Sequence, residues 1–567
     1  MPPAAAPLSP SAHVDTFTRD HLPPAELWPV IEFTTPELAY PGRLNAAAAL
    51  IDAPAEALGA GRPALRTAGG VTWTYGELLT RANQVAHVLT EDLGLVPGQR
   101  VLLRSPNNPW TVAAWLGVLK AGGVVVTTMA ALRARELGPV AERTQPSVAL
   151  VDHRLTEDVY AVRDTVLPSL TVIAYGGDAP DDLTALAAAK PGQFANVATA
   201  ADDVALLAPT SGSTGVPKIT MHFHRDILAI CDTFDRHALR LTPDDVVACS
   251  APLAFTFGLG MLLVFPLRAG ACALLTEQAT PAQLADLVAT EHVTVLATAP
   301  TAYKAILRDG LEHKLAGLRT AVSAGEHIPQ GTWERLRDSI GLKVIDGIGS
   351  TELLHIFITA AGDDIRPGAT GRPLPGVRAA ILGQDGTELG PGEPGRLGVI
   401  GPVGCRYLDD ERQRNYVTGG WNTTGDVFYK DADGYFYYQA RSDNMIVSAG
   451  YNIGGPEVEA AIDTHPDVLE SAVVGRQDAE RGSVVCAFVV LRDGVPSDAT
   501  AAAKAEEIQV YVKSVLAPYK YPRDVRFTAA LPRNASGKLQ HFALREILAR
   551  EQAVLDQEGG ERKETLA

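Results

Sequence analysis

The stretch Ala208-Pro-Thr-Ser-Gly-Ser-Thr-Gly-Val-Pro-Lys218 lies between two apolar runs, one within residues 203–208 and the other within residues 219–223. Both runs are typical of strands, so the stretch is expected to be a loop between them. Glycines leave backbone N–H groups open, hydroxyls add hydrogen bonds, and the lysine supplies positive charge, all of which suit a polyphosphate. The candidate phosphate ligands are Thr210, Ser211, Gly212, Ser213, Thr214, Gly215 and Lys218.

The spacing within this loop excludes the common P-loop. Gly212 is followed five residues later by Pro217 and then by Lys218, and no Ser or Thr comes directly after the lysine. A loop rich in Ser, Thr and Gly is often only a flexible turn. The strand-like flanks favour a phosphate site of another type.

Strand-like and helix-like stretches alternate from about Trp73 to Ile345, which is the rhythm of layered α/β architecture. The expected strands include residues 100–103, 124–128, 293–298, 318–323 and 342–345.

The pattern changes twice after this region. Between Gly371 and Ala440, short strand-like pieces broken by Gly, Pro and Asp indicate a small β-rich unit. From Asn444 onward, strands alternate with helices again, one of them opened by Pro456. We therefore expect an α/β protein whose large N-terminal domain contains layered α/β subdomains and the β-rich unit, followed by a smaller α+β domain and a charged tail. The expected bounds are 1–441, 442–550 and 551–567.

Composition narrows the class of protein. The chain has 567 residues and a formal net charge of −17, which argues against nucleic acid or an anionic membrane as a partner. Its five cysteines lack the spacing of a disulfide framework or a zinc site. The first residues do not resemble a secretory signal, and the most apolar runs, 113–132 and 261–275, are interrupted by charged residues. We expect a cytoplasmic enzyme, monomeric or homodimeric.

Four clusters downstream of the loop carry further chemistry. They are Asp346-Gly-Ile-Gly-Ser-Thr-Glu352, preceded by Ser323-Ala-Gly-Glu326; Trp421-Asn-Thr-Thr-Gly-Asp426; Ala440-Arg-Ser-Asp-Asn-Met-Ile446; and Leu531-Pro-Arg-Asn-Ala-Ser-Gly-Lys538. Singly, they also fit a capped helix start, a turn, a surface ion pair and a solvated lysine. In this order and at these distances, they resemble the adenylate-forming superfamily of acyl-CoA synthetases, adenylation domains and luciferase-like enzymes over nearly the whole chain.

The resemblance implies a nucleotide site. Thr351 and Glu352 would meet the ATP phosphates and Mg²⁺, a hard cation that prefers oxygen ligands. Asp426 would accept hydrogen bonds from both ribose hydroxyls, and Arg441 would contact the nucleotide. Ile348 stands where the family often has an aromatic residue stacked on adenine. The implied adenine contacts are Ala324, Gly325, Glu326, Asp346, Gly347 and Ile348.

The resemblance also implies a mobile C-terminal domain. Lys538 would stabilise charge as the acyl-adenylate forms, and Asp443 would be the hinge about which this domain rotates. Gly450 would then line the tunnel for the pantetheine arm of coenzyme A. Gln540 departs from the Arg frequent in the family, which puts a phosphate contact from that position in doubt.

The implied reaction has two steps. The substrate carboxylate attacks the α-phosphorus of ATP, giving an acyl-adenylate and pyrophosphate, and the thiol of coenzyme A then displaces AMP. Lys218, Thr351, Glu352 and Lys538 are the candidate catalytic residues. His222 and His224 alternate on an expected strand and lack further ligands at metal spacing.

The acid substrate is expected to be aromatic. Amino-acid-activating relatives carry an Asp in the segment matching Pro252 to Gly258, and here that segment has no acid. Phe, Thr and His side chains resemble the flat aryl pocket of benzoate-CoA ligases, although core packing or a satisfied buried histidine would also explain them. The candidate pocket residues are Phe255, Thr256, Phe257, Gly258, Gly349, His355 and Ile356.

Two runs outside the pocket, 21–28 and 448–457, look most like 2-aminobenzoate-CoA ligases. Thr256 and Phe257 replace the Ala and Tyr usual in simple benzoate ligases, and we hypothesise that Thr256 binds an ortho amino or hydroxyl group. Salicylate or benzoate as substrate, and a carrier protein as thiol acceptor, stay open. A non-enzymatic nucleotide sensor is disfavoured because Lys218, Glu352, Asp426 and Lys538 are all present.

Overall fold

The residues around the phosphate loop form a hairpin of two antiparallel strands, β7 (Val204–Thr210) and β8 (Lys218–Phe223), with Thr210 opposite Lys218. The hairpin closes one edge of a six-stranded sheet with the order β6-β5-β3-β4-β7-β8. All pairs except β7–β8 are parallel. The other strands are β3 (Arg100–Ser105), β4 (Val124–Met129), β5 (Val148–Asp152) and β6 (Thr171–Tyr175), joined by α4 (Pro109–Lys120), α5 (Ala134–Thr144) and α6 (Thr156–Thr165).

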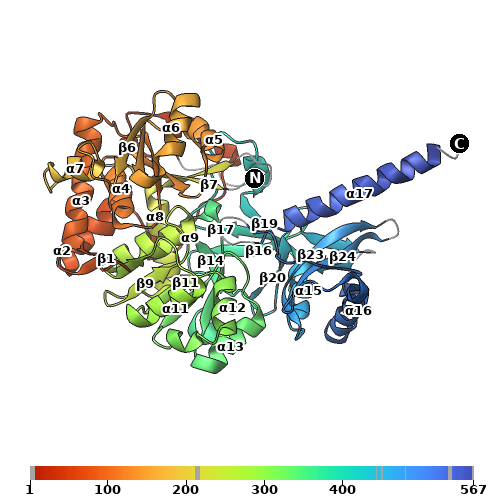
Figure 1. Ribbon diagram of the computed structural model, residues 1–567. Helices are drawn as coiled ribbons and strands as arrows, with labels where there is room; N and C mark the ends of the chain where they lie inside the picture. Colours follow the sequence, from red (N-terminus) through yellow and green to blue (C-terminus); the bar gives the residue numbers. More distant parts are fainter. Residues whose placement is uncertain are drawn as a thin grey trace. The chain divides into compact units, whose positions relative to one another are not determined.

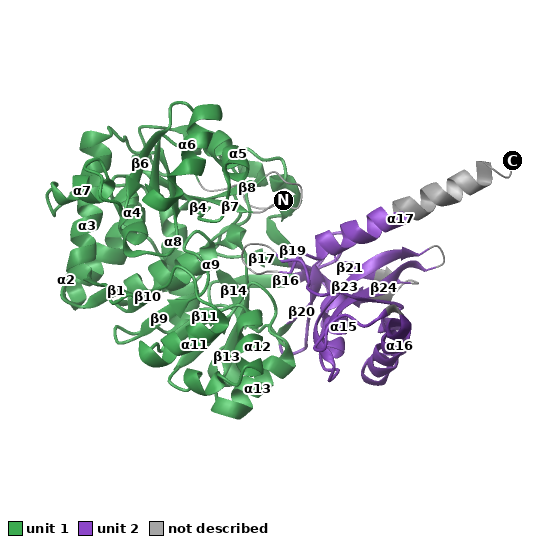
Figure 2. Cartoon of the chain, viewed as in Figure 1, with its two compact units in different colours: residues 1–380, 398–424, 434–436 green, residues 381–397, 425–433, 437–567 purple. Residues whose placement is uncertain are grey.

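This computed structural model describes residues 7–210, 217–441, 444–448, 451–478, 481–533 and 539–564. The chain forms two compact units, which are coloured separately in Figure 2, and their helices and strands are labelled in Figure 1. Unit 1 contains Met1–Ala380, Gly398–Thr424 and Gly434–Phe436, and unit 2 contains Ile381–Leu397, Gly425–Asp433 and Tyr437–Ala567. Part of the β-rich segment thus belongs to unit 2, and the domain boundary expected after residue 441 stays a prediction.

A second sheet of unit 1 has nine strands in the order β15-β14-β13-β12-β11-β9-β10-β1-β2. The run from β13 to β1 is parallel, because strands alternate there with covering helices. The strands are β1 (Pro63–Thr67), β2 (Thr72–Thr74), β9 (Val246–Cys249), β10 (Cys272–Leu275), β11 (Val295–Thr298), β12 (Thr320–Ser323), β13 (Val344–Gly349), β14 (Ile356–Thr359) and β15 (Arg372–Pro373). The main helices are α3 (Tyr75–His87), α11 (Pro281–Thr290), α12 (Pro300–Arg308) and α13 (Gln330–Ile340).

The strands of both sheets are rich in buried aliphatic residues, which is why they form nearly continuous apolar runs in the sequence. Every residue of β3, β5, β10 and β11 is buried, as expected for strands covered on both faces. The strands expected at 100–103, 124–128, 293–298, 318–323 and 342–345 correspond to β3, β4, β11, β12 and β13. The layered α/β expectation is therefore confirmed.

The β-rich segment forms a sheet with the order β16-β17-β19-β18, and β20 pairs with β19. Its strands are β16 (Arg378–Leu382), β17 (Gly395–Ile400), β18 (Val417–Thr418), β19 (Trp421–Lys430) and β20 (Phe436–Arg441).

Unit 2 contains another sheet, β22-β21-β24-β23, with β25 paired to β24. Val458 on α15 and Ile508 and Val512 on α16 are buried in its core. The strands are β21 (Met445–Ser448), β22 (Tyr451–Gly454), β23 (Val468–Asp478), β24 (Gly482–Leu491) and β25 (Asp524–Phe527), and the helices are α15 (Gly455–Ile462), α16 (Asp498–Val515) and α17 (His541–Glu564). The α+β expectation is confirmed, and α17 continues into the residues expected as a charged tail.

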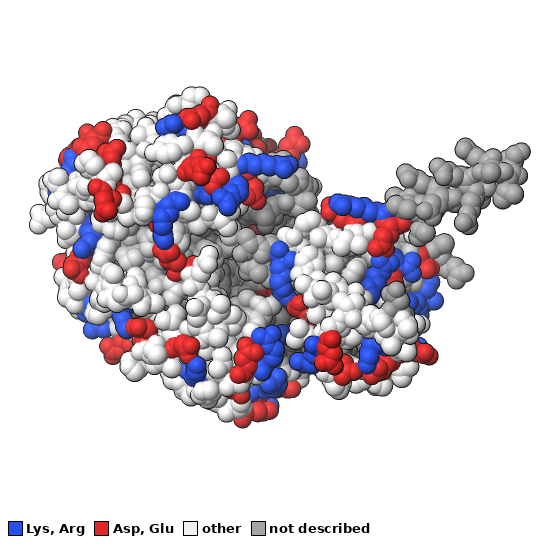
Figure 3. Space-filling model, in the orientation of Figure 1, with Lys and Arg blue, Asp and Glu red and all other residues white. Residues whose placement is uncertain are grey.

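The surface carries charges of both signs. Figure 3 shows Lys and Arg side chains interspersed with Asp and Glu on the face in view. Of the helices in the described part of the chain, none is long and apolar enough to cross a membrane.

Candidate active site

The polyphosphate end of the candidate site begins at the β7–β8 hairpin. Thr210 ends β7 and Lys218 begins β8, so the two residues are paired at the mouth of the loop. The Lys218 ammonium lies 3.3 Å from the Tyr407 hydroxyl and 5.1 Å from the centre of its ring. The other predicted phosphate ligands, Ser211, Gly212, Ser213, Thr214 and Gly215, lie outside the described residues.

Thr351 and Glu352 occupy a short 3₁₀ turn, η9 (Thr351–Leu353), directly after β13. The Ser350 hydroxyl caps the turn by accepting a hydrogen bond from the Leu353 amide at 3.3 Å. The turn is also tied to the hairpin, because the His222 Nε2 atom on β8 lies 2.8 Å from the Thr351 carbonyl oxygen. Burial lowers the pKa of His222 to about 4, so the ring is neutral at pH 7 and donates this bond.

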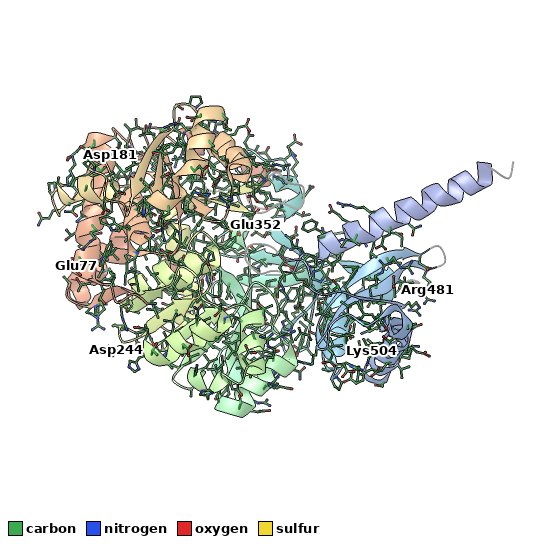
Figure 4. The ribbon with its side chains drawn as sticks, viewed as in Figure 1. Glu77, Asp181, Asp244, Glu352, Arg481 and Lys504 are labelled. Carbon is green, nitrogen blue, oxygen red and sulfur yellow. The ribbon has the colours of Figure 1, made fainter. Side chains whose placement is uncertain are left out.

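Tyr407 joins the two charged residues at this end of the site. Its hydroxyl donates a hydrogen bond to Glu352 Oε1 at 2.5 Å, and the Tyr407 hydroxyl oxygen also accepts a hydrogen bond from Lys218 Nζ (Glu352 is labelled in Figure 4). Burial, and then the Glu352 carboxylate, raise the pKa of Tyr407, so the phenol keeps the proton that it donates. The structure thus brings together Lys218, Thr351 and Glu352, as the sequence predicted, and adds Tyr407.

The sequence reasoning missed Tyr407 because residues 406–408 follow no quoted motif. They pair with β8 through Met221 N–Arg406 O at 2.8 Å and Leu408 N–Ile219 O at 2.9 Å. The sequence does indicate the place of His222, because Lys218, Thr220 and His222 alternate along one strand and therefore share a face.

The candidate adenine contacts lie at the ends of two neighbouring strands. Ser323 on β12 is opposite Asp346 on the parallel strand β13, so the segment 324–326 and Asp346 lie at the same carboxyl end of the sheet. Gly325 has a φ of 92°, a left-handed conformation that favours glycine. A Cβ at Gly347 would lie 2.7 Å from Ile356 Cγ2, so a side chain would not fit there. Ile348, also on β13, is partly buried.

Asp346 has one paired and one open carboxylate oxygen. Its Oδ2 atom lies 2.8 Å from His327 Nδ1, whereas its buried Oδ1 atom has no hydrogen-bond partner in the part of the chain that the structure describes. Burial alone would lower the pKa of His327, but the Asp346 carboxylate raises it overall. Sequence reasoning missed His327, although it directly follows the quoted segment 323–326. The open oxygen can accept a hydrogen bond from a nucleobase amino group.

The candidate ribose contacts form a pair within unit 2. Arg441 Nη1 lies 3.3 Å from Asp426 Oδ1, and Asp426 is 9 % exposed. Gly425 has a φ of 77°, and a Cβ there would lie 3.1 Å from Arg441 Nη2. The pair leaves part of the Arg441 side chain exposed. The predicted Asp443, Gly450 and Lys538 lie outside the described residues.

The candidate aryl pocket contains a box of aromatic rings around His355. Phe257 stacks on the imidazole at a centroid distance of 5.6 Å and an interplanar angle of 29°, and Phe265 meets it edge-on at 4.6 Å. Phe234 lies 5.1 Å away on a further side. Sequence reasoning identified Phe257 and His355 but missed Phe234 and Phe265, whose surroundings look like ordinary apolar helix.

His355 is a neutral group in this box. The residue is 3 % exposed, and burial lowers its pKa to about 3. Neither ring nitrogen makes a hydrogen bond of standard geometry among the described residues, and a contact with the Phe257 backbone partly offsets the effect of burial on the pKa. A buried polar atom without a partner is costly unless a ligand or water completes it, so a substrate contact and a histidine completed by water both stay open.

Glycines keep the pocket segments close together. A Cβ at Gly349 would lie 2.8 Å from the carbonyl carbon of His355, and a Cβ at Gly258 would lie 2.1 Å from the Pro252 carbonyl oxygen. Ile356 pairs with Gly349 across β13 and β14. Phe255 precedes α9 (Thr256–Leu259), and Thr256 begins it, so both stand next to Phe257 in the chain.

Comparison with known proteins identifies the family. The AMP-binding enzyme family matches residues 52–406, and the AMP-binding enzyme C-terminal domain matches residues 457–538. A benzoate–CoA ligase of Thauera aromatica is 34% identical over 527 residues, which cover 90% of this chain and 98% of that protein.

Two solved structures are also similar. The anthranilate CoA ligase AuaEII, crystallised with anthranoyl-AMP, is 29% identical with a TM-score of 0.85, and the match covers 92% of this chain and 100% of that one. A benzoate CoA ligase from Burkholderia xenovorans LB400 is 32% identical with a TM-score of 0.80, covering 88% and 100%. These matches confirm the resemblance inferred from the motifs. The chain belongs to the AMP-binding enzyme family, within the adenylate-forming superfamily, and is an AMP-forming acid–thiol ligase.

Proposed function

We propose that the chain is an ATP-dependent aryl-CoA ligase that activates a benzoate-type acid. The observation that carries this proposal is the neutral aromatic box around His355, next to a segment that has no acidic side chain for a substrate ammonium group. Flat apolar walls suit a benzene ring. Relatives named as benzoate and anthranilate CoA ligases support the same substrate class.

The first step joins the acid to AMP. A carboxylate oxygen of the acid bonds to the α-phosphorus of ATP as the bond to the pyrophosphate oxygen breaks. In this proposal, Lys218 and the loop 210–215 hold the β- and γ-phosphates, and Lys538 stabilises the negative charge at the α-phosphate and the carboxylate. Asp346 faces the base, while Asp426 and Arg441 hold the ribose.

The residues at the polyphosphate end fit a magnesium ion. Glu352 provides a carboxylate and Thr351 a hydroxyl on the same turn, η9, which is the oxygen chemistry that Mg²⁺ prefers. When bound, the ion would neutralise charge on the leaving pyrophosphate. Glu352 and Thr351 are the residues proposed to hold it.

The second step forms the thioester. The sulfur of coenzyme A bonds to the carbonyl carbon of the aryl-adenylate, AMP leaves with the bonding electrons, and the thiol proton is released. We place Asp443 at the hinge between the two steps and Gly450 beside the incoming pantetheine arm, as the family resemblance implies.

For the ring substituent, we propose 2-aminobenzoate. Thr256 begins the helix that carries Phe257 against His355, and its hydroxyl stands next to Phe257 in the chain. A hydrogen bond to an ortho amino or hydroxyl group would favour such acids by about 2- to 10-fold over benzoate.

The test incubates the protein with ATP, Mg²⁺, coenzyme A and equal concentrations of benzoate, salicylate and 2-aminobenzoate, and measures each aryl-CoA by mass. We expect 2-aminobenzoyl-CoA to dominate. Thr256→Ala should remove this preference, whereas Thr256→Ser, which keeps the hydroxyl, should retain it. An unchanged preference in Thr256→Ala would remove Thr256 from the proposal. Aryl transfer to a phosphopantetheinylated carrier protein but not to coenzyme A would contradict the choice of acceptor.

A further inference from the structure

Tyr407 lies between two side chains of opposite charge. Its hydroxyl oxygen is 2.5 Å from Glu352 Oε1 and 3.3 Å from Lys218 Nζ. Among the described ion pairs, Lys218 and Glu352 are not joined to each other directly. A neutral phenol therefore separates the carboxylate proposed to hold Mg²⁺ from the ammonium proposed to hold phosphate.

The position of the phenol is fixed from several sides. Tyr407 is fully buried, its backbone N–H donates to Gln413 Oε1 at 3.0 Å, and its neighbours pair with β8. Arg406, the preceding residue, is anchored by a buried ion pair with Asp226 at 3.1 Å. Since the ring is held in this way, its hydroxyl can restrict the rotamers of the Glu352 and Lys218 side chains.

Removing the hydroxyl would let the two charges approach each other. A direct Lys218–Glu352 ion pair would neutralise both groups, and each would have to be released before it could bind its own ligand. The hydroxyl prevents this by giving Glu352 a donor and by occupying the space between the charges. Tyrosine suits the task because it donates a hydrogen bond without carrying charge.

We propose that Tyr407 is a positioning residue for the polyphosphate end of the site, which keeps Glu352 and Lys218 apart and oriented toward Mg²⁺ and phosphate. This inference rests on the proposed roles of Glu352 and Lys218. It adds a residue outside the motifs by which the family was identified.

The test measures MgATP binding by titration calorimetry in the absence of the acid. Tyr407→Phe should raise the dissociation constant for MgATP about 10-fold, since a hydrogen bond to a charged group is lost and a competing ion pair forms. Tyr75→Phe is the matched control, because Tyr75 is equally buried and donates its hydroxyl to the Ala271 carbonyl at 2.8 Å. That control should bind MgATP as the wild type does.

A double-mutant cycle separates positioning from a general structural effect. Glu352→Gln should weaken MgATP binding by itself, and Tyr407→Phe should then change it by less than about twofold, because the residue through which Tyr407 acts is already neutral. If Tyr407→Phe weakens binding equally in both backgrounds, or in neither, the inference is wrong. If Glu352→Gln leaves binding unchanged, the proposed role of Glu352 fails as well, which distinguishes the two failures.

A crystal structure decides the question if Tyr407→Phe does not fold. In the wild-type protein with Mg²⁺ and a non-hydrolysable ATP analogue, we expect the Tyr407 hydroxyl within hydrogen-bond distance of Glu352 and no direct Glu352–Lys218 pair. A Tyr407 hydroxyl that contacts neither side chain would overturn the inference.

Discussion

Gly260 lies at the wall of the aromatic box, and its replacement by alanine tests whether the placement of His355 matters for the acid. A Cβ at Gly260 would lie 2.5 Å from His355 Cδ2, 2.7 Å from His355 Nε2 and 2.9 Å from Phe265 Cε2. Real Cβ contacts of this kind are not shorter than 3.0 Å, so the imidazole must move. Phe234, Phe257 and Phe265 surround the ring and oppose that movement.

The magnitude follows from overpacking and from helix propensity. Forcing an extra methyl group into a packed core costs about 1–3 kcal/mol. Gly260 lies in a helical segment, where alanine regains up to about 1 kcal/mol. The net change in folding free energy is therefore a loss of about 0–2 kcal/mol, and a displacement of the imidazole that removes the same amount from acid binding would raise the KM for the aryl acid by up to about 30-fold. The KM for ATP should change less, because the clash is with the His355 ring, whereas Glu352 lies on η9, which meets His355 through its backbone.

The assay compares Gly260→Ala with Gly331→Ala. Gly331 lies in helix α13, and no described atom lies within 4 Å of its Cβ position, so this variant has the propensity gain without the clash. Steady-state kinetics with varied acid and varied ATP, together with melting temperatures, separate the clash with His355 from the gain in helix propensity. If both variants give the same KM for the acid and the same melting temperature, the box around His355 does not position the substrate.

Three further predictions concern other parts of the chain. Asp226→Ala should destabilise unit 1 by about 3–5 kcal/mol, because it leaves the fully buried Arg406 charge unpaired, and adding Arg406→Met should recover most of this loss in denaturant unfolding. The pKa of His327 is raised in the folded state, so its ion pair with Asp346 stabilises the fold fully at pH values below the unfolded pKa and loses this contribution as the pH rises through the folded pKa. The melting temperature of the wild type should therefore fall relative to that of His327→Gln between pH 6 and pH 9. Parallel melting curves for the two proteins would contradict the pairing. Lys538→Ala should nearly abolish formation of the aryl-adenylate while sparing thioester formation from supplied aryl-adenylate, and an equal loss of both steps would defeat the proposed division of labour.

The parts of the fold that could be predicted are those marked by a pattern within a few consecutive residues. Buried parallel strands consist of continuous apolar residues, so β3, β4, β11, β12 and β13 could be located from the chain alone. The turn from Thr351 to Glu352 and the loop before Lys218 were recognisable because their chemistry is concentrated within a few consecutive residues. The division of the β-rich segment between two units has no such signal, because it depends on which strands pack together over long sequence distances.

Tyr407 shows why part of the site escapes a reading of consecutive residues. It stands 189 positions after Lys218 and 55 after Glu352, and it meets both only because residues 406–408 pair with β8 in one register. A shift of that register by one residue would turn Tyr407 to the opposite face and bring Arg406 or Leu408 to the polyphosphate end. Arg406 would add a second cation beside Lys218, and Leu408 could give Glu352 no hydrogen bond. The register is held by the buried Arg406–Asp226 pair and by the backbone bonds to Ile219 and Met221. Stability in this segment and function at the polyphosphate end are therefore coupled, so that Asp226→Ala should weaken MgATP binding in addition to lowering stability, although Asp226 belongs to none of the nucleotide-binding motifs.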